Sequence, residues 1–181
     1  EFLPRLNKNL EQAANIESFW PKEEIVLAIQ FEYLAANTFP TGKKDSKIDS
    51  ITKNLYSEAH VKYHPIIRNY LKTFGYYDIF LIDHESGNIV YSVFKEVDFG
   101  TSLLDGPYKD TNFAKAFRAA RMATKKDFVR MTDFEPYFPS YNAPAAFIAS
   151  PIFQGEKKIG VLIFQMPIVE INRVMTGDNN W

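Results

Sequence analysis

The sequence predicts an α+β fold in which long N-terminal helices precede an antiparallel sheet. Up to Gly75, apolar residues recur at three- and four-residue spacings, as they do along the buried face of a helix. From Tyr76 onward they alternate with a period of two, which is typical of strands. The expected order is helices, hairpin, helix and second hairpin, and this order favours antiparallel pairing over βαβ units.

The N-terminal part predicts two helical regions. The first covers residues 1–38, and the second runs from about residue 49 to residue 74. Pro65 lies inside the second region and has no N–H to donate, so we expect a kink or a split there. Gly75 is well suited to end this helix.

The remaining elements are expected in the second part of the chain. They are strands over 77–83 and 88–94, a helix over 111–123 capped by Asp110 or Thr111, a short strand over 128–132, a hairpin of 144–153 with 157–166, and a short helix over 168–175. The first strand is apolar on both faces, so both faces of the sheet must be covered. We expect the N-terminal helices on one face and a cavity on the other.

Composition excludes several classes of protein. Of the 181 residues, 21 are Lys or Arg and 22 are Asp or Glu, a balance that offers nothing to nucleic acid or an anionic membrane. Cysteine is absent, which excludes disulfides, thiol catalysis and Cys-ligated zinc. No apolar stretch approaches the roughly 18 residues that cross a bilayer.

His60 and His64 lie one helical turn apart, the spacing found in zinc proteases. No Glu follows His60, and the remaining histidine, His84, lies in a turn far along the chain. A surface or capping pair is therefore favoured over a metal site. A metal-dependent hydrolase that uses these two residues stays open as an alternative.

Other catalytic patterns lack support. No Gly-x-Ser-x-Gly motif occurs, and Gly100 and Gly106 do not form a phosphate-binding loop. Glu96 and Asp98 share one face of an extended segment, but no base or nucleophile accompanies them. We therefore expect a protein that is not an enzyme and that uses neither a metal nor a cofactor.

Residues 132–144 form the most informative loop, with four aromatic residues and three prolines. Prolines fix φ, so such a loop can keep a preset shape. Aromatic rings that carry hydroxyls suit a pocket with apolar walls and a few hydrogen bonds. The alternative is a hydrophobic loop that only caps the sheet, and the residues leave both interpretations open.

Several motifs in combination resemble a known family. Pro136-Tyr137, Ala149-Ser150-Pro151-Ile152, Gly155, Gly160-Val161 and the closing helix from Ile168 resemble the second half of Cache domains. These are PAS-like sensor modules of bacterial chemoreceptors, histidine kinases and nucleotide cyclases. Residues 76–83, 91–101 and 106–108 resemble a subgroup that lies between two transmembrane helices, upstream of cytoplasmic signalling domains. The resemblance covers about residues 31–175.

The resemblance implies a fold, a function and a division of the chain. Residues 1–75 would be a helical region, 76–175 a module with a PAS-like antiparallel sheet, and 176–181 a linker toward a second, membrane-proximal module. The long N-terminal helices would cover one face of the sheet. The protein would be the extracytoplasmic, periplasmic ligand-sensing domain of a receptor, most closely of the methyl-accepting chemotaxis type, and homodimeric in the full receptor.

The resemblance also implies a pocket between the sheet and the segment after the first hairpin, closed by the loop before the penultimate strand. The ligand-binding residues that it implies are Tyr91, Lys95, Asp98, Tyr108, Asp133 and Tyr137. The charged residues at the strand exit would then face a cavity, where ion pairing and a ligand satisfy them. The alternative is a spacer module that has no ligand.

One departure from the family bears on the ligand. Members that sense amino acids carry an Arg-x-Trp-Tyr stretch and an Asp shortly after the Pro-Tyr pair. Here residues 99–108 contain neither Arg nor Trp, and Phe138 and Pro139 follow Tyr137. An α-amino acid is therefore not expected, and Lys95 leads us to expect a small anionic ligand.

Overall fold

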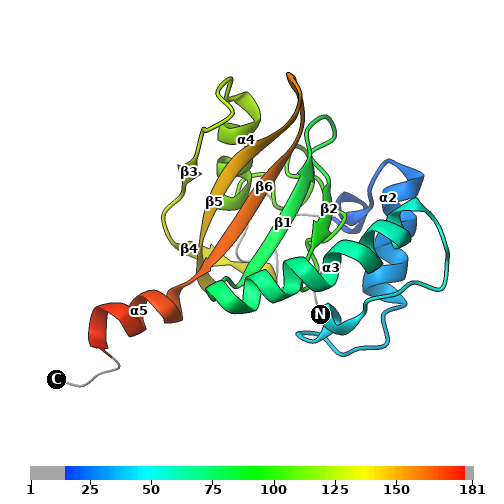
Figure 1. The fold of residues 1–181 in the computed structure, drawn as a ribbon, viewed down its shortest axis with the longest axis horizontal. Coiled ribbons are helices and arrows are strands. Elements are labelled where there is room, and N and C mark those ends of the chain that lie inside the picture. The colour runs from blue at the N-terminus through cyan, green and yellow to red at the C-terminus, as the bar shows by residue number, and fades with distance from the viewer. Residues whose placement is uncertain (1–14, 178–181) are drawn as a thin grey trace.

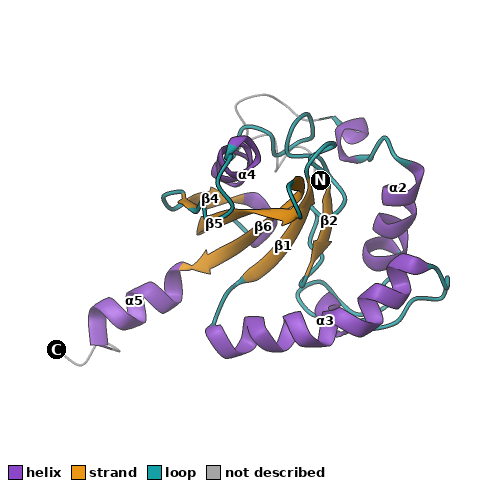
Figure 2. Ribbon diagram, turned by 45° about the horizontal axis from the view of Figure 1, so that its top comes forward, coloured by secondary structure: helices purple, strands orange, loops and turns teal. Residues whose placement is uncertain are grey.

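The computed structural model describes residues 15–177. A 6-stranded antiparallel sheet has the order β2-β1-β6-β5-β3, and β4 pairs with β5 outside this path (Figure 1). Helix α3 lies on one side of the sheet and α4 on the other (Figure 2). The predicted α+β class with an antiparallel sheet is confirmed.

The strands follow the predicted hairpins closely. They are β1 (Asp78–Asp83), β2 (Ile89–Ser92), β3 (Arg130–Met131), β4 (Glu135–Tyr137), β5 (Ala143–Gln154) and β6 (Lys157–Pro167). Strand β4 was not predicted, because Pro136 at its centre argues against a strand. It is tolerated there because β4 pairs on one side only, with β5.

Four α-helices are described: α2 (Glu24–Gln30), α3 (Leu55–Phe74), α4 (Asn112–Met122) and α5 (Ile168–Thr176). Short helical turns lie at Ile16–Phe19, Phe31–Ala35, Lys44–Ser46 and Phe138–Ser140. Of the helix expected over 1–38, residues 1–14 lie outside the described part. Within the described part the expected single helix is interrupted over residues 20–23, because Trp20 precedes Pro21 and takes an extended conformation (φ −91°, ψ 122°).

Helix α3 is continuous through Pro65, so the expected split does not occur. A capping box begins the helix: Asn54 Oδ1 accepts from the Ser57 N–H at 2.9 Å, and Ser57 Oγ accepts from the Asn54 N–H at 2.9 Å. Pro65 is exposed, so water can reach the carbonyl that it leaves without a partner. Gly75 ends the helix at φ 72°, as predicted.

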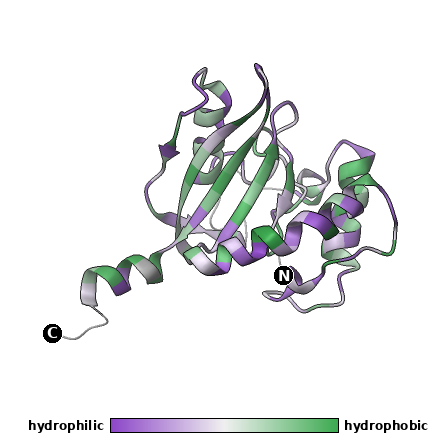
Figure 3. Cartoon of the chain, viewed as in Figure 1, coloured by the Kyte–Doolittle hydropathy of each residue, from purple (hydrophilic) through white to green (hydrophobic). Residues whose placement is uncertain are grey.

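The core has one part on each face of the sheet. Ile79 and its neighbours Leu71, Tyr91 and Val93 form the part beneath α3. Phe80 turns to the other face, where α4 contributes Phe113 and Phe117. The hydropathy colouring shows apolar residues concentrated along the central strands (Figure 3). The prediction that the first strand is covered on both faces is confirmed.

The N-terminal helices do not share one face of the sheet. Helix α3 covers a face, whereas α2 lies beyond the β2 edge (Figures 1 and 2). Ile29 of α2 and Tyr33 after it reach the core on the α4 side. Helix α5 leaves the body at the end of β6 (Figure 1).

Candidate ligand-binding site

The chain turns inward where β2 ends. Lys95 has a left-handed backbone (φ 53°), and its N–H donates to Ser92 Oγ at 2.8 Å. The side chain is fully buried, and its ammonium group donates to the carbonyls of Ser92 and Val93, each at 3.2 Å. Burial lowers the pKa of Lys95 to about 7.

Three buried carboxyl groups lie near this turn: Asp78, Glu96 and Asp98. Asp98 Oδ2 accepts from the Tyr137 hydroxyl at 2.7 Å, while Oδ1 is buried without a hydrogen-bond partner among the described residues. Burial raises the pKa of Asp98 to about 6. Burial and then the neighbouring Asp98 raise the pKa of Asp78 to about 8 and of Glu96 to about 9.

The space between the sheet and α4 is filled by aromatic side chains. Phe113 stacks on Phe147 with ring centroids 4.5 Å apart, and Tyr137 meets Phe147 edge-on at 5.2 Å. Tyr108 is fully buried and lies 5.9 Å from Tyr137, ring centroid to ring centroid. The room expected beneath this face of the sheet is therefore largely occupied by the protein's own rings.

A hollow of about 450 Å³ opens instead beneath residues 132–144, which we call the flap. Lys95, Glu96 and Val97 form one wall, and Phe138, Pro139, Tyr141 and Asn142 of the flap form another. Leu34, Thr41, Gly42 and Lys44, from the segment between α2 and α3, complete it. The hollow thus lies where the exit of β2 meets the flap, the two segments that the sequence singled out.

The flap has a defined shape. Tyr141 and Asn142 both have positive φ (58° and 60°), and their N–H groups donate to the carbonyls of Phe138 and Tyr137, each at 3.0 Å. Gln165 of β6 donates to Ser140 Oγ at 2.8 Å and ties the flap to the sheet. The flap is a structured wall of the hollow.

The six residues implied by the family resemblance fall into three groups. Asp98, Tyr108 and Tyr137 lie together on the α4 side of the sheet. Tyr91 and Lys95 lie together nearer α3, with Lys95 Nζ 5.4 Å from the centre of the Tyr91 ring. Of the six, Lys95 lines the hollow.

Asp133 lies apart from the other five. It is exposed, and its side chain accepts from the N–H of Phe134, the next residue, at 2.7 Å. Glu96 was not among the expected ligand-binding residues, although it is buried and lines the hollow. Its position beside Asp98, in the charged stretch after β2, is the sequence feature that could have identified Glu96 as a residue of the site.

The two helical histidines are buried, so the expected surface or capping pair is wrong. Their rings stack 4.4 Å apart. His64 Nε2 bonds the Asp45 carbonyl at 2.8 Å, and His60 Nδ1 bonds the Ile48 carbonyl at 2.7 Å. Because a carbonyl oxygen only accepts, these two nitrogens carry the protons.

The remaining nitrogen of His64 is Nδ1, which lies 2.8 Å from the Tyr91 hydroxyl. Burial lowers the pKa of His64 to about 4 and of His60 to about 3, so both rings are neutral at pH 7 and Tyr91 donates to Nδ1. The pair therefore holds the loop before α3 against the sheet. Within residues 15–177, no three His, Asp or Glu side chains are arranged to hold a metal ion.

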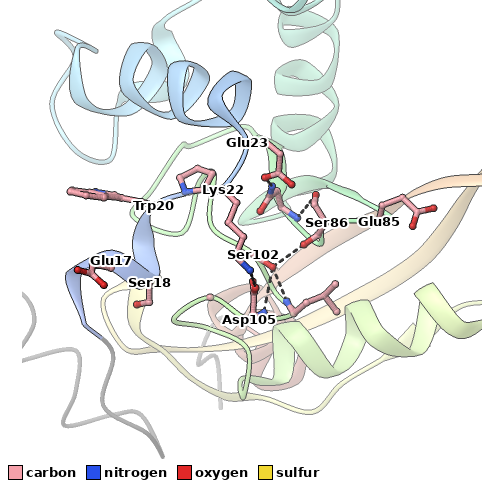
Figure 4. A pocket seen from close by; sticks show the side chains of 13 residues that line it. Glu17, Ser18, Trp20, Lys22, Glu23, Glu85, Ser86, Ser102 and Asp105 are labelled. Carbon is pink, nitrogen blue, oxygen red and sulfur yellow. Dashed lines mark hydrogen bonds and ion pairs between the residues drawn. The ribbon is translucent and has the colours of Figure 1, made fainter.

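A second hollow, of about 340 Å³, lies beside the N-terminal turn (Figure 4). Several of its polar groups bond one another: Lys22 pairs with Asp105, and Ser102 Oγ donates to the Ser86 carbonyl at 2.9 Å. Trp20 stands at its rim with 62% of its surface exposed. Since its lysine and its serine hydroxyls already have partners within the protein, this hollow is a weaker candidate than the one beneath the flap.

No protein-family model matches the sequence, and no curated protein sequence matches it either. Among solved structures, the chain is similar to the sensor domain of the V. cholerae histidine kinase DctB, with 16% identity and a TM-score of 0.47. That alignment covers 94% of this chain and 55% of the other.

Two chemoreceptor domains are similar at the same level. The sensory domain of Campylobacter jejuni Tlp3 with isoleucine bound has 15% identity and a TM-score of 0.48, covering 83% of this chain and 52% of the other. The ligand-binding domain of Pseudomonas fluorescens CtaA in complex with L-serine has 13% identity and a TM-score of 0.44, covering 81% and 50%. This chain therefore spans about half the length of these solved structures.

Proposed function

We propose that this chain is a ligand-sensing, extracytoplasmic module of a bacterial transmembrane receptor, of the Cache type and most closely of the chemotaxis class. The motifs quoted from the sequence support this function, together with the antiparallel sheet between α3 and α4. None of the described helices is long and apolar enough to cross a membrane. The transmembrane helices and the signalling domain of such a receptor would lie outside this chain.

The observation that carries the proposal is the hollow beneath the flap. Its volume of about 450 Å³ suits a small molecule, since ligand pockets measure roughly 300–1,000 Å³. Its wall combines apolar side chains, such as Val97 and Phe138, with the charged groups at the exit of β2. This mixture provides both burial and orientation for a ligand.

The position of the hollow offers a route for a signal. A ligand there would touch both the flap and the segment between α2 and α3, and Gln165 connects the flap to β6, which leads into α5. A ligand biases two conformations only by its different affinity for each of them. Contacts of the ligand with the flap and with the segment between α2 and α3 would supply this difference.

Two finer expectations belong to this proposal. An anionic ligand was expected from Lys95, but the two carbonyls that hold its ammonium group do not support that class of ligand. Homodimerisation is supported by apolar side chains exposed on α3, namely Ile66, Tyr70 and Phe74. Light scattering on a chain that contains both modules tests it, and a monomer at high concentration would contradict it.

A spacer module that binds nothing is the second candidate. The rings that fill the space between the sheet and α4 favour it, because they occupy the room in which a ligand was expected. The metal-dependent hydrolase has less support, since three of the four ring nitrogens of His60 and His64 already have hydrogen-bond partners.

A thermal-shift screen separates sensor from spacer. A ligand at 100 times its Kd stabilises the folded state by about 2.7 kcal/mol, whereas a spacer responds to no compound. Val97→Trp would fill the hollow and should abolish the shift. Val129→Trp, at an exposed position outside the hollow, is the matched control and should retain it. A screen without any shift, or an equal shift in both variants, would contradict the proposal.

A further inference from the structure

Glu96 is a buried carboxyl to which no residue in the described part of the chain donates a hydrogen bond. Its side chain lies at the junction of two hollows, the one beneath the flap and another of about 320 Å³ on the side of Tyr76 and Tyr77. Only 7% of the residue is exposed. Among the described residues none donates a hydrogen bond to its carboxyl group. A carboxyl group in such a place requires either a proton or a cation.

The charged neighbours of Glu96 add to this requirement. Asp98 and Asp78 both act on its carboxyl group and disfavour its ionised form. Asp98 is itself buried, with Oδ1 unpartnered among residues 15–177. Asp78 accepts hydrogen bonds from the N–H groups of Ile79 and Val93, so Glu96 and Asp98 Oδ1 are the groups at this corner to which no described residue donates.

Two tyrosine side chains lie beside the same corner. Tyr141 of the flap lines both hollows together with Glu96, and Tyr77, just before β1, lines the second of them. Aromatic faces attract cations, so rings beside a carboxylate favour an ammonium group as the ligand.

The two lysines on the wall of the hollow are turned to the backbone. Lys95 Nζ donates to two carbonyls at 3.2 Å. Lys44 Nζ donates to the carbonyls of Leu34 at 2.8 Å and Asn37 at 3.3 Å. Each ammonium group thus uses two of its three N–H donors to bond protein carbonyls, so one donor remains for an anionic ligand.

These observations lead us to propose that the hollow beneath the flap binds a small organic cation, an amine or a quaternary ammonium compound with an apolar body. Glu96 binds the charged group, with Asp98 behind it, and Leu34, Val97 and Phe138 contact the apolar body. The inference rests on the proposed sensor function and specifies its class of ligand.

Binding in this site exchanges a proton for the ligand. In the empty hollow at pH 7 Glu96 is protonated, since burial and the neighbouring carboxyl groups raise its pKa to about 9. When the cation binds, the carboxyl group ionises and its proton leaves to solvent. About one proton is then released for each cation bound. An anion held by a lysine would not produce this release.

Compounds of matched shape and different charge test whether the hollow prefers a cation. Isothermal titration calorimetry of the chain compares isopentylammonium with isovalerate and isopentanol, and choline with its neutral isostere 3,3-dimethyl-1-butanol. The two cations should bind more tightly than their neutral counterparts and than the anion. Titrations in phosphate and in Tris, which differ in ionisation enthalpy, measure the proton release.

A conservative substitution tests the role of Glu96 in cation binding. Glu96→Gln keeps the shape of the side chain and needs no proton, so it should fold, and it should weaken binding of both cations at least tenfold and abolish the proton release. Glu58→Gln, at an exposed position on α3, should leave both unchanged.

The possible outcomes distinguish a failure of the cation site from a failure of the proposed sensor function. Tighter binding of isovalerate, or cation binding that Glu96→Gln leaves intact, would overturn the cation site while the sensor function stands. Failure of all five compounds here, together with a thermal-shift screen that yields no shift, would overturn both. An unfolded Glu96→Gln leaves the comparison of matched compounds and the proton release in the natural protein as the decisive data.

Discussion

Lys95 shows how a few contacts fix the chemistry of this region. Its left-handed backbone costs about 1 kcal/mol for a residue with a side chain, and the Ser92 hydroxyl and two carbonyls hold it in place. The sequence placed charge at the exit of β2 correctly. It could not show that the lysine would bond its own backbone while Glu96 remained without a donor, because that choice depends on the turn.

Tyr91 is expected to stabilise the fold through His64. Tyr91→Phe removes the hydroxyl and leaves the Nδ1 acceptor buried and unpaired, which should cost about 1–3 kcal/mol of unfolding free energy. Urea denaturation measures this loss. Tyr63→Phe, at a position 50% exposed on α3 next to His64, is the control and should change little. Equal stability of the two variants would contradict the assigned hydrogen bond.

Glu96 is expected to make stability depend on pH. Its pKa rises from 4.5 in the unfolded chain to about 9 in the fold, so between these pH values the folded state holds a proton that the unfolded state has lost. Its contribution to stability therefore falls as pH rises from about 4.5 to about 9. Glu96→Gln removes this dependence. The unfolding free energy of the variant, relative to that of the natural protein, should therefore rise by up to about 1.4 kcal/mol per pH unit in this range.

His60 and His64 are present in both proteins and do not act on Glu96, so their contributions cancel in this comparison. The lowered pKa values of His60 and His64 contribute stability that is complete above pH 6.5 and is lost as pH falls toward 4 and 3. Parallel curves of unfolding free energy against pH for the natural protein and Glu96→Gln would show that the Glu96 carboxyl is not perturbed.

At the scale of elements, alternation and turn residues predicted both hairpins and α4 within a residue or two. Two further differences from the expected elements have local causes. Strand β4 contains Pro136, and the helix expected before Glu24 is interrupted at Trp20-Pro21. Helix α3 begins at its capping box, six residues later than its apolar stripe indicated, because Asn54 satisfies the free N–H groups of the first turn.

The cap of α3 should have a measurable effect. Asn54→Ala removes the acceptor for the Ser57 N–H and should lower the unfolding free energy by about 1 kcal/mol. Asn69→Ala, exposed in the body of the same helix, should be neutral or slightly stabilising, because Ala favours the helix. Chemical denaturation of both variants gives the comparison. An Asn54→Ala variant as stable as Asn69→Ala would argue against the capping box.

At the scale of the whole molecule, the sequence predicted a two-sided sheet and a cavity associated with the flap. The position predicted for the cavity within that region was wrong. The large rings of Phe113, Tyr137 and Phe147 close the space between the sheet and α4, and the opening lies between the flap and the segment before α3. Periodicity tells which side chains turn inward, but it does not tell how completely they fill the space that they share.

The crystal structure of the protein with the compound that gives the largest thermal shift tests the central claim most directly. We expect density for that compound beneath the flap, between Glu96 and Val97 on one wall and Phe138 and Tyr141 on the other. Density in the polar hollow beside Trp20, with the space beneath the flap unchanged, would contradict it.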